Sequence, residues 1–216
     1  MQINHRTDIL GLTDLQPTFM PGGELPVADG NSIVPIVNQL LVHFDHAFAT
    51  QDWHPANHAS FATAHPGKRA YDTIEMPYGT QVLWPDHAIA GTPSAAIHSG
   101  IDQTRIEAII RKGFRPDLDS YSAFFENDHQ TPTGLEAWLR QRGFSRLFLC
   151  GLATDFCVAW SAEDAARLGF AVTIIQDASR GIALPEPDGR TTMDTAWERL
   201  TAIGVRFIDS GELAPS

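Results

Sequence analysis

The sequence predicts an α/β fold: a three-layer sandwich around a central, mostly parallel sheet of six strands. Short apolar runs alternate with segments of helical periodicity along most of the chain. The runs lack the strict polar alternation of a one-sided sheet, so we expect helices to cover both faces. Neither a repeat nor a linker divides the sequence, and we expect one domain over residues 1–216.

The first three strands are expected at 8–13 (DILGLT), 46–50 (HAFAT) and 105–111 (RIEAIIR). Between the first two, Asn31 or Ser32 can cap a helix that has Pro35 in its first turns. Apolar residues then recur at helical spacing as far as Phe44. These segments form the first half of the predicted sheet and one of its covering helices.

The second half of the predicted sheet has strands at 146–151 (RLFLCG), 170–175 (FAVTII) and 205–208. Helices are expected at 133–142, 154–168 and 191–203. Gly143 and Gly169 stand where the first two of these helices should end. The alternation of strand and helix is therefore complete except in one region.

That region, residues 51–101, has little periodicity and is rich in proline, histidine and aromatic residues. Loops of about fifty residues in a compact domain are usually functional or disordered. Five aromatic side chains argue against disorder: Trp53, Phe61, Tyr71, Tyr78 and Trp84. We therefore expect this loop region to bind a metal or a substrate.

Composition excludes several classes of partner. The net charge of -11 argues against nucleic acid and anionic membranes. Cys150 and Cys157 are too few for a secreted disulfide scaffold, and no apolar run is long enough for a signal peptide or a membrane span. We expect a cytoplasmic protein without nucleic-acid or membrane partners.

Chemically reactive residues follow four of the predicted strands. Asp14, Asp52, Lys112 and Cys157 come after the first, second, third and fourth strand respectively. Ligands of open α/β sheets bind beyond the carboxyl ends of the strands, so we expect these side chains to converge. Thirteen of the fifteen basic residues are arginines, which makes a lysine at a strand end an exception.

Cys157 is expected near a helix N-terminus, where a thiol can act as a nucleophile; the alternative is a buried, inert thiol, which we expect for Cys150 inside its strand. The helix dipole and Lys112 should lower the pKa of the Cys157 thiol, while Asp14 opposes them. Asp14 would serve as base and proton donor, and Lys112 would stabilise the charges. Backbone N–H groups of residues 151–154 could bind an oxyanion.

A D-x-H pair, Asp52 and His54, can share one metal ion because alternate side chains of an extended segment point the same way. His87 offers a third ligand, with His58 and His65 as further candidates. Two histidines and one aspartate leave positions for water, as in a catalytic site. They suit one divalent ion per chain, with zinc our first choice and iron or manganese as alternatives.

Taken together, the motifs of this sequence resemble the nicotinamidases, also called pyrazinamidases, in the isochorismatase-like cysteine hydrolase superfamily. The resemblance runs from about Asp8 to Asp209 and rests on DLQPTFMPGGEL (14–25), TQDWHP (50–55), HASF (58–61), QVLWPDH (81–87), YSAFF (121–125), GLATDFCV (151–158) and DASRGI (177–182). One departure, Pro17-Thr18 in place of the usual Asn-Asp, borders the expected ring pocket.

The resemblance implies a role for each candidate. It implies a catalytic triad of Asp14, Lys112 and Cys157, metal ligands Asp52, His54 and His87 with a further contact from Ser60, ring-binding Phe19 and Trp84, and oxyanion donors in the backbone N–H groups of Ala153 and Cys157. It also implies a cis peptide bond between Leu152 and Ala153.

The implied activity is hydrolysis of nicotinamide to nicotinate and ammonia, a step of NAD salvage, through a cysteine thioester; pyrazinamide should also be cleaved. Because dimers and larger assemblies are common in the superfamily, a homo-oligomer is compatible with the resemblance. Two alternatives stay open at this point. One is a related metal-independent amidohydrolase acting on a carbamoyl or ureido substrate, and the other is a non-catalytic metal-binding protein on this fold.

Overall fold

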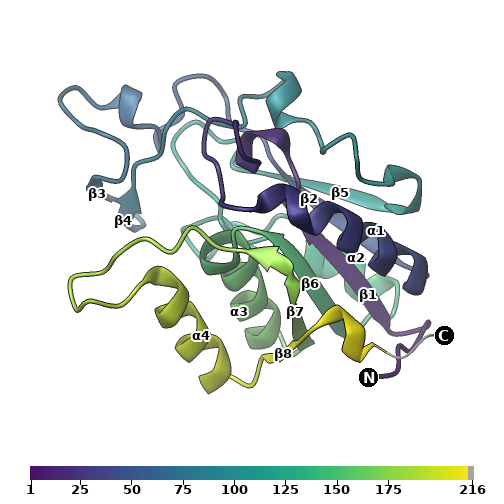
Figure 1. Ribbon diagram of the computed structural model, residues 1–216. Coiled ribbons are helices and arrows are strands. Elements are labelled where there is room, and N and C mark those ends of the chain that lie inside the picture. Colours follow the sequence, from purple (N-terminus) through teal and green to yellow (C-terminus); the bar gives the residue numbers. More distant parts are fainter. Residues whose placement is uncertain (214–216) are drawn as a thin grey trace.

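The apolar runs form the central sheet that the sequence predicts. The computed structural model describes residues 1–213, and within them six parallel strands lie in the order β5-β2-β1-β6-β7-β8 (Figure 1). The strands are β1 (Asp8–Thr13), β2 (Ala47–Asp52), β5 (Ala108–Lys112), β6 (Arg146–Leu152), β7 (Ala171–Arg180) and β8 (Arg206–Ile208). The predicted fold class is confirmed.

Helices cover both faces of the sheet, because successive strand side chains point to opposite sides. Ile9 of β1 packs in one apolar cluster and Leu10 in the other. The helix α1 (Val34–His43) covers the face of Leu10 with Val37 and Leu40. The other face is covered by α2 (Leu135–Gln141), α3 (Ala159–Arg167) and α4 (Thr192–Ala202). Figure 1 shows α1 on one side of the sheet and α3 and α4 on the other.

Several element boundaries differ from the sequence-based expectation. The helix α1 begins at Val34 after a 3-10 turn and has no side-chain cap; Ser32 Oγ donates to the carbonyl of Asp29 instead, so the predicted cap is wrong. Strand β7 continues five residues past the expected end, to Arg180. A π-helical turn, Thr154–Val158, precedes α3 and contains Cys157.

The loop region of residues 51–101 is largely irregular, as expected, but it also contains a short hairpin. Its strands are β3 (Thr73–Met76) and β4 (Gly79–Val82), which pair antiparallel. Figure 1 shows this hairpin on the opposite side of the molecule from the N-terminus. Gln81 of β4 is buried and hydrogen bonds Asp119, so the hairpin is tied to the residues that follow β5.

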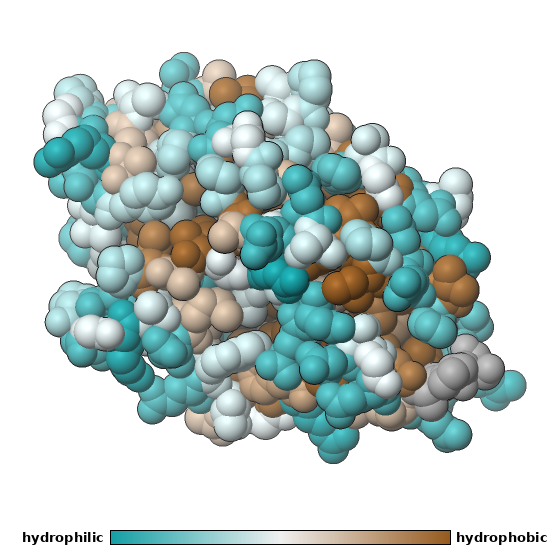
Figure 2. Space-filling model, in the orientation of Figure 1, coloured by the Kyte–Doolittle hydropathy of each residue, from teal (hydrophilic) through white to brown (hydrophobic). Residues whose placement is uncertain are grey.

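Hydrophilic residues cover most of the face shown in Figure 2, and apolar residues form separate patches between them. Within residues 1–213, no helix is long and apolar enough to cross a membrane.

Gly151 lets the ends of β1 and β6 approach closely. It pairs with Thr13, the residue before Asp14, and has a φ of 123°. A Cβ atom at this position would lie 2.1 Å from the backbone oxygen of Thr13, which cannot move without shifting β1. The glycine therefore sets the spacing of the two strands beside the candidate site.

We expect Gly151→Ala to destabilise the protein by at least about 1 kcal/mol more than Gly169→Ala, since overpacking typically costs about 1–3 kcal/mol. Gly169 is the matched control: its φ is also positive, at 87°, but open space surrounds its Cβ position. Urea denaturation of both variants measures the difference. Equal losses would show that backbone strain alone, and not the contact with Thr13, requires glycine at position 151.

Candidate active site

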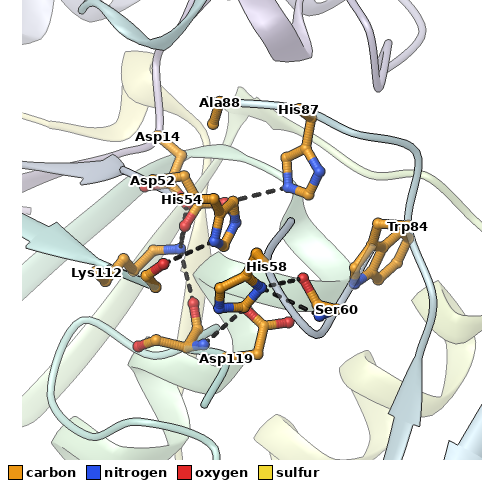
Figure 3. A network of polar contacts seen from close by, with 12 residues as sticks. Asp14, Asp52, His54, His58, Ser60, Trp84, His87, Ala88, Lys112 and Asp119 are labelled. Atoms are coloured by element: carbon orange, nitrogen blue, oxygen red, sulfur yellow. Dashed lines mark hydrogen bonds and ion pairs between the residues drawn. The ribbon is translucent and has the colours of Figure 1, made fainter. Parts of the chain in front are cut away.

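The strand order brings the predicted site residues into one row. Strands β5, β2, β1 and β6 are neighbours in the sheet. Lys112 ends β5, Asp52 ends β2, Asp14 follows β1, and Cys157 lies in the turn after β6. Carboxyl ends of parallel strands share one edge, which explains why residues so far apart in sequence meet there. Figure 3 shows Asp14, Asp52 and Lys112 close together.

The Lys112 ammonium joins the members of this row and is fully buried. Its Nζ lies 2.9 Å from Asp14 Oδ2 and 2.5 Å from Asp52 Oδ1. It also donates to the carbonyl of Ser120 at 3.0 Å and lies 3.4 Å from Cys157 Sγ. Burial alone would lower the pKa of Lys112, but the attraction of Asp14 and then of Asp52 raises it well above its ordinary value. The lysine is therefore a permanent cation.

Asp14 is fixed from its other side by Thr50. The Thr50 hydroxyl donates to Asp14 Oδ1 at 2.6 Å and accepts from the Asp14 backbone N–H at 3.1 Å. Asp14 has a φ of 47°, a left-handed conformation that aspartate tolerates better than most residues. With Oδ1 bound to the hydroxyl, Oδ2 faces Lys112.

Burial raises the pKa of the Cys157 thiol well above its ordinary value. Lys112 opposes this, but Asp14 and Asp52 add to it. The expected lowering of the thiol pKa is therefore wrong, because loss of water and two nearby carboxylates outweigh one cation. Burial also raises the pKa of Asp14, despite Lys112. A carboxylate with a raised pKa is a stronger base, so the pair is suited to passing a proton.

The other thiol lies in different surroundings. Cys150 is fully buried in β6, with its Sγ 3.7 Å from the carbonyl oxygen of Gly11. Burial raises the pKa of Cys150 to about 12, with a further contribution from Asp177. Beyond it, the Leu152–Ala153 peptide bond is cis, as the resemblance implies.

Asp52 also faces the two histidines that the sequence singled out. Its Oδ2 is 3.4 Å from His54 Nε2 and 3.6 Å from His87 Nε2. Bonds of about 2.0–2.2 Å to a tetrahedral zinc ion would separate such ligand atoms by roughly 3.3–3.6 Å. The three side chains therefore fit a divalent ion, and they form a candidate metal site.

Backbone carbonyls fix which ring nitrogen of each of these two histidines carries a proton. His54 Nδ1 lies 2.8 Å from the carbonyl of Gly113, and His87 Nδ1 lies 2.8 Å from that of Pro85. A carbonyl oxygen only accepts hydrogen bonds, so each Nδ1 carries the proton. In the neutral ring, each Nε2 then carries the lone pair, which is the usual arrangement for histidines that bind a metal ion.

Ser60, the expected further metal contact, is bound to a histidine. Its Oγ is 2.7 Å from His58 Nδ1, which also accepts the Ser60 backbone N–H (Figure 3). His58, His54 and Asp119 form another group with metal-ligand spacing. Of the His54 ring nitrogens, however, Nδ1 is bonded to Gly113 and Nε2 faces Asp52. Asp52, His54 and His87 therefore fit a metal ion better than His54, His58 and Asp119 do.

A pocket adjoins both groups of candidate ligands. Phe19 and Trp84 line it, as the resemblance implies, together with Cys157 and Ala153. The sequence did not single out five further lining residues: Leu25, Asp119, Tyr121, Phe156 and Ile182. All of them except Asp119 lie within a motif that carried the resemblance, which was the only signal available.

Tyr121 fixes the orientation of the Trp84 wall. Its hydroxyl oxygen accepts the Trp84 indole N–H at 3.0 Å and the Gln81 amide at 3.0 Å. The Phe156 ring stands edge-on to Trp84, with centroids 5.0 Å apart. A flat aromatic molecule would therefore meet rigid apolar walls on one side, with the thiol and the candidate metal ligands beside it.

Several known proteins are similar to this chain in sequence and in fold. The isochorismatase domain model matches residues 9–212. A nicotinamidase from Acinetobacter baylyi is 47% identical over 199 residues, which cover 92% of this chain and 91% of that protein. The structure of a nicotinamidase and pyrazinamidase from Acinetobacter baumanii is 46% identical, with a TM-score of 0.91 over 96% of this chain and 98% of that one.

A pyrazinamidase from Pyrococcus horikoshii, solved in complex with zinc, is 32% identical with a TM-score of 0.73, covering 94% of this chain and 98% of that one. The domain model and these relatives span almost the whole described chain, including the row of strand-end residues and the cavity beside it. This protein therefore belongs to the isochorismatase-domain family.

Proposed function

We propose that the protein hydrolyses nicotinamide to nicotinate and ammonia, and that it also cleaves pyrazinamide. The single observation that carries the proposal is the contact of Cys157, Asp14 and Lys112 beside an aromatic-lined cavity. A thiol, a base and a fixed cation are the groups that amide hydrolysis through a thioester needs. Relatives that cover most of the chain carry the names nicotinamidase and pyrazinamidase, which supports this substrate class.

Asp52, His54 and His87 would hold one divalent ion per chain, with Ser60 as a further contact. We propose zinc, because two nitrogens and one oxygen suit it and a pyrazinamidase neighbour is titled as a zinc complex. When bound, such an ion supplies a Lewis acid that attracts the pyridine nitrogen and orients the ring. Phe19 and Trp84 would enclose the ring from either side.

In the first half of the reaction, Asp14 takes the Cys157 proton as sulfur attacks the carboxamide carbon. A C–S bond forms, and an electron pair of the C=O bond moves to oxygen. The backbone N–H groups of Ala153 and Cys157 would stabilise that oxyanion. Asp14 returns the proton to nitrogen, the oxygen electron pair re-forms the C=O bond, and the C–N bond breaks. Ammonia departs, and a thioester remains on Cys157.

In the second half, Asp14 removes a proton from water, which attacks the thioester carbon. The C–S bond breaks, the proton on Asp14 returns to Cys157, and the product acid loses the second proton of the water to solvent and leaves as nicotinate. Lys112 keeps its positive charge in this scheme, in agreement with the upward direction of its pKa shift. It thereby offsets the negative charge that moves between Asp14 and the thiol.

We further propose that residues 1–216 form one domain, of which 214–216 lie outside the described residues. Within it, residues 51–101 would be the metal- and substrate-binding region. A cytoplasmic location is supported by two free cysteines. A homo-oligomer, and the absence of nucleic-acid or membrane partners, stay proposals from the sequence.

The two alternatives are less favoured. A metal-independent amidohydrolase has no need for two histidines with preset tautomers facing one carboxylate. A non-catalytic metal-binding protein has no need for a buried thiol, base and cation in contact. Both features together favour the metal-dependent hydrolase.

Purified protein should release ammonia and nicotinate from nicotinamide, and Cys157→Ala should lose about 1000-fold or more of this activity because the nucleophile is gone. Cys150→Ala is the matched control and should stay active. A coupled ammonia assay measures all three proteins. A Cys157→Ala enzyme that is as active as the parent would rule out the thioester mechanism, and an inactive parent would rule out the proposed substrate.

His54→Ala should bind far less metal, since the chain then retains only Asp52 and His87. Elemental analysis of dialysed protein should find about one ion per chain in the parent and a small fraction of that in the variant. His65→Ala serves as the control. His65 lies in the same loop region, but its Nε2 is hydrogen bonded to the carbonyl of Ala59 and not directed at Asp52. Equal metal content in the parent and His54→Ala would contradict the ligand set.

Lys112→Arg should keep the fold but lower kcat by at least about 100-fold. The guanidinium is planar and larger, so it cannot reproduce contacts of 2.5–3.4 Å to two carboxylates, a carbonyl and a thiol in a closed space. Circular dichroism checks the fold and steady-state kinetics check the rate. Parental turnover by the arginine variant would show that positive charge alone is sufficient.

A further inference from the structure

We propose that Gln16 is a positioning residue whose side-chain amide holds the backbone of Asp52. Among residues 1–213, Asp52 is the one carboxylate that contacts both Lys112 and the two candidate metal-binding histidines. Gln16 would therefore control the geometry of the metal site and of the triad together. The inference rests on the proposed function for its catalytic meaning, but its structural basis is independent of the substrate.

Strand β1 ends before its backbone can pair with Asp52 of β2. Its register with β2 pairs Leu12 with Ala49, and β1 stops at Thr13. The chain then turns away at Asp14, whose φ is 47°. The last residues of β2 therefore extend past the β1 backbone that would otherwise pair with them.

On its other side, β2 continues to pair with β5. Asp52 is in register with Lys112, and the N–H of Trp53 donates to the Lys112 carbonyl at 3.0 Å. Hydrogen bonding alternates along a parallel strand, so the polar groups of Trp53 face β5 and those of Asp52 face the β1 side. The N–H and C=O of Asp52 thus point to where β1 has ended.

The Gln16 amide occupies that place and pairs with both groups. Its Oε1 accepts the Asp52 N–H at 2.8 Å, and its Nε2 donates to the Asp52 carbonyl at 2.9 Å. The second N–H of Nε2 donates to the carbonyl of Ala95 at 2.8 Å. Gln16 is fully buried, so no solvent water is available to replace these bonds. Only a carboxamide offers one acceptor and two donors on a single planar group.

Loss of this amide would move the carboxylate of Asp52. Its Oδ1 is 2.5 Å from Lys112 Nζ, and its Oδ2 lies 3.4 and 3.6 Å from the two histidine nitrogens. Both sets of contacts depend on where the end of β2 lies. Partners that orient a metal ligand typically change metal affinity or activity by about 10–100-fold when they are removed.

Gln51 provides a matched control, because it is a buried glutamine next to Asp52. Its Nε2 donates to the same Ala95 carbonyl at 2.7 Å, and its Oε1 accepts from Arg111 at 3.2 Å. Its side chain makes no hydrogen bond to the Asp52 backbone among the described residues. Gln51→Met therefore removes an amide of the same size from the same neighbourhood but leaves the hold on Asp52 intact.

The experiment compares the parent with Gln16→Met, Gln16→Glu and Gln51→Met. Each protein is stripped of metal and titrated with Zn²⁺ against a chromophoric chelator, and its thermal unfolding is recorded. Gln16→Met should bind Zn²⁺ about 10–100-fold more weakly than the parent. Gln16→Glu keeps the shape and the acceptor but loses the donors, and it should also bind more weakly. Gln51→Met should bind Zn²⁺ like the parent.

Steady-state kinetics with nicotinamide at saturating Zn²⁺ provide the second measurement. A lower kcat in Gln16→Met than in Gln51→Met, once the site is filled, would show that the triad geometry also depends on Gln16. An inactive parent would refute the proposed function, while the Zn²⁺ affinities would still decide the role of Gln16.

Three results would overturn the inference. One is equal Zn²⁺ affinity in Gln16→Met and Gln51→Met. Another is failure of both Gln16 variants to fold while Gln51→Met folds, which would make Gln16 a residue of the whole fold rather than of the site. The third is a parent that binds no Zn²⁺.

Discussion

The site depends on one buried cation, the Lys112 ammonium held between two carboxylates. A buried charge is costly unless it is paired and hydrogen bonded, and Lys112 is paired with both Asp14 and Asp52. These three residues belong to the ends of β1, β2 and β5, which are neighbours in the sheet. The strand order therefore places two carboxylates beside the buried ammonium of Lys112 and brings the reactive groups together.

Asp52 connects two kinds of chemistry. One of its carboxylate oxygens faces Lys112 and the other faces His54 and His87. Burial pushes the pKa of Asp52 upward, but Lys112 and then His54 bring it well below its ordinary value. It thus stays ionised, as a metal ligand would have to be. Any shift of this residue would disturb both the proposed triad and the candidate metal site, and its backbone is hydrogen bonded on both sides.

Burial also changes the way the nucleophile must be activated. Sequence reasoning expected the helix terminus and Lys112 to lower the pKa of the Cys157 thiol, with Asp14 as the base, but the structure buries Cys157 near two carboxylates. The thiol therefore keeps its proton until a base removes it. Asp14, whose pKa is raised by the same burial, is suited to that task. Proton transfer within the pair then replaces a preformed thiolate.

Local patterns in the sequence were enough to predict the strands of the central sheet and the residues at their ends, but not the β3–β4 hairpin. Strand β1 has the predicted bounds, because an unbroken apolar run between polar residues is a local signal. The motifs also led to the family, and the resemblance supplied the expected roles of Phe19, Trp84 and Ser60. The stop of β7 at Arg180 and the missing cap of α1 were not predictable, because neighbouring strands and turns determine them.

Only the tertiary structure decided which groups touch. The bonds of Gln16 to Asp52 and Ala95, of Thr50 to Asp14, and of Tyr121 to Trp84 join residues at least 36 positions apart. The direction of the Cys157 pKa shift also depends on the tertiary structure, because the packing of the whole site determines how far the thiol is buried. A sequence pattern reports local preference and composition, whereas contact and desolvation arise only when distant strands lie side by side.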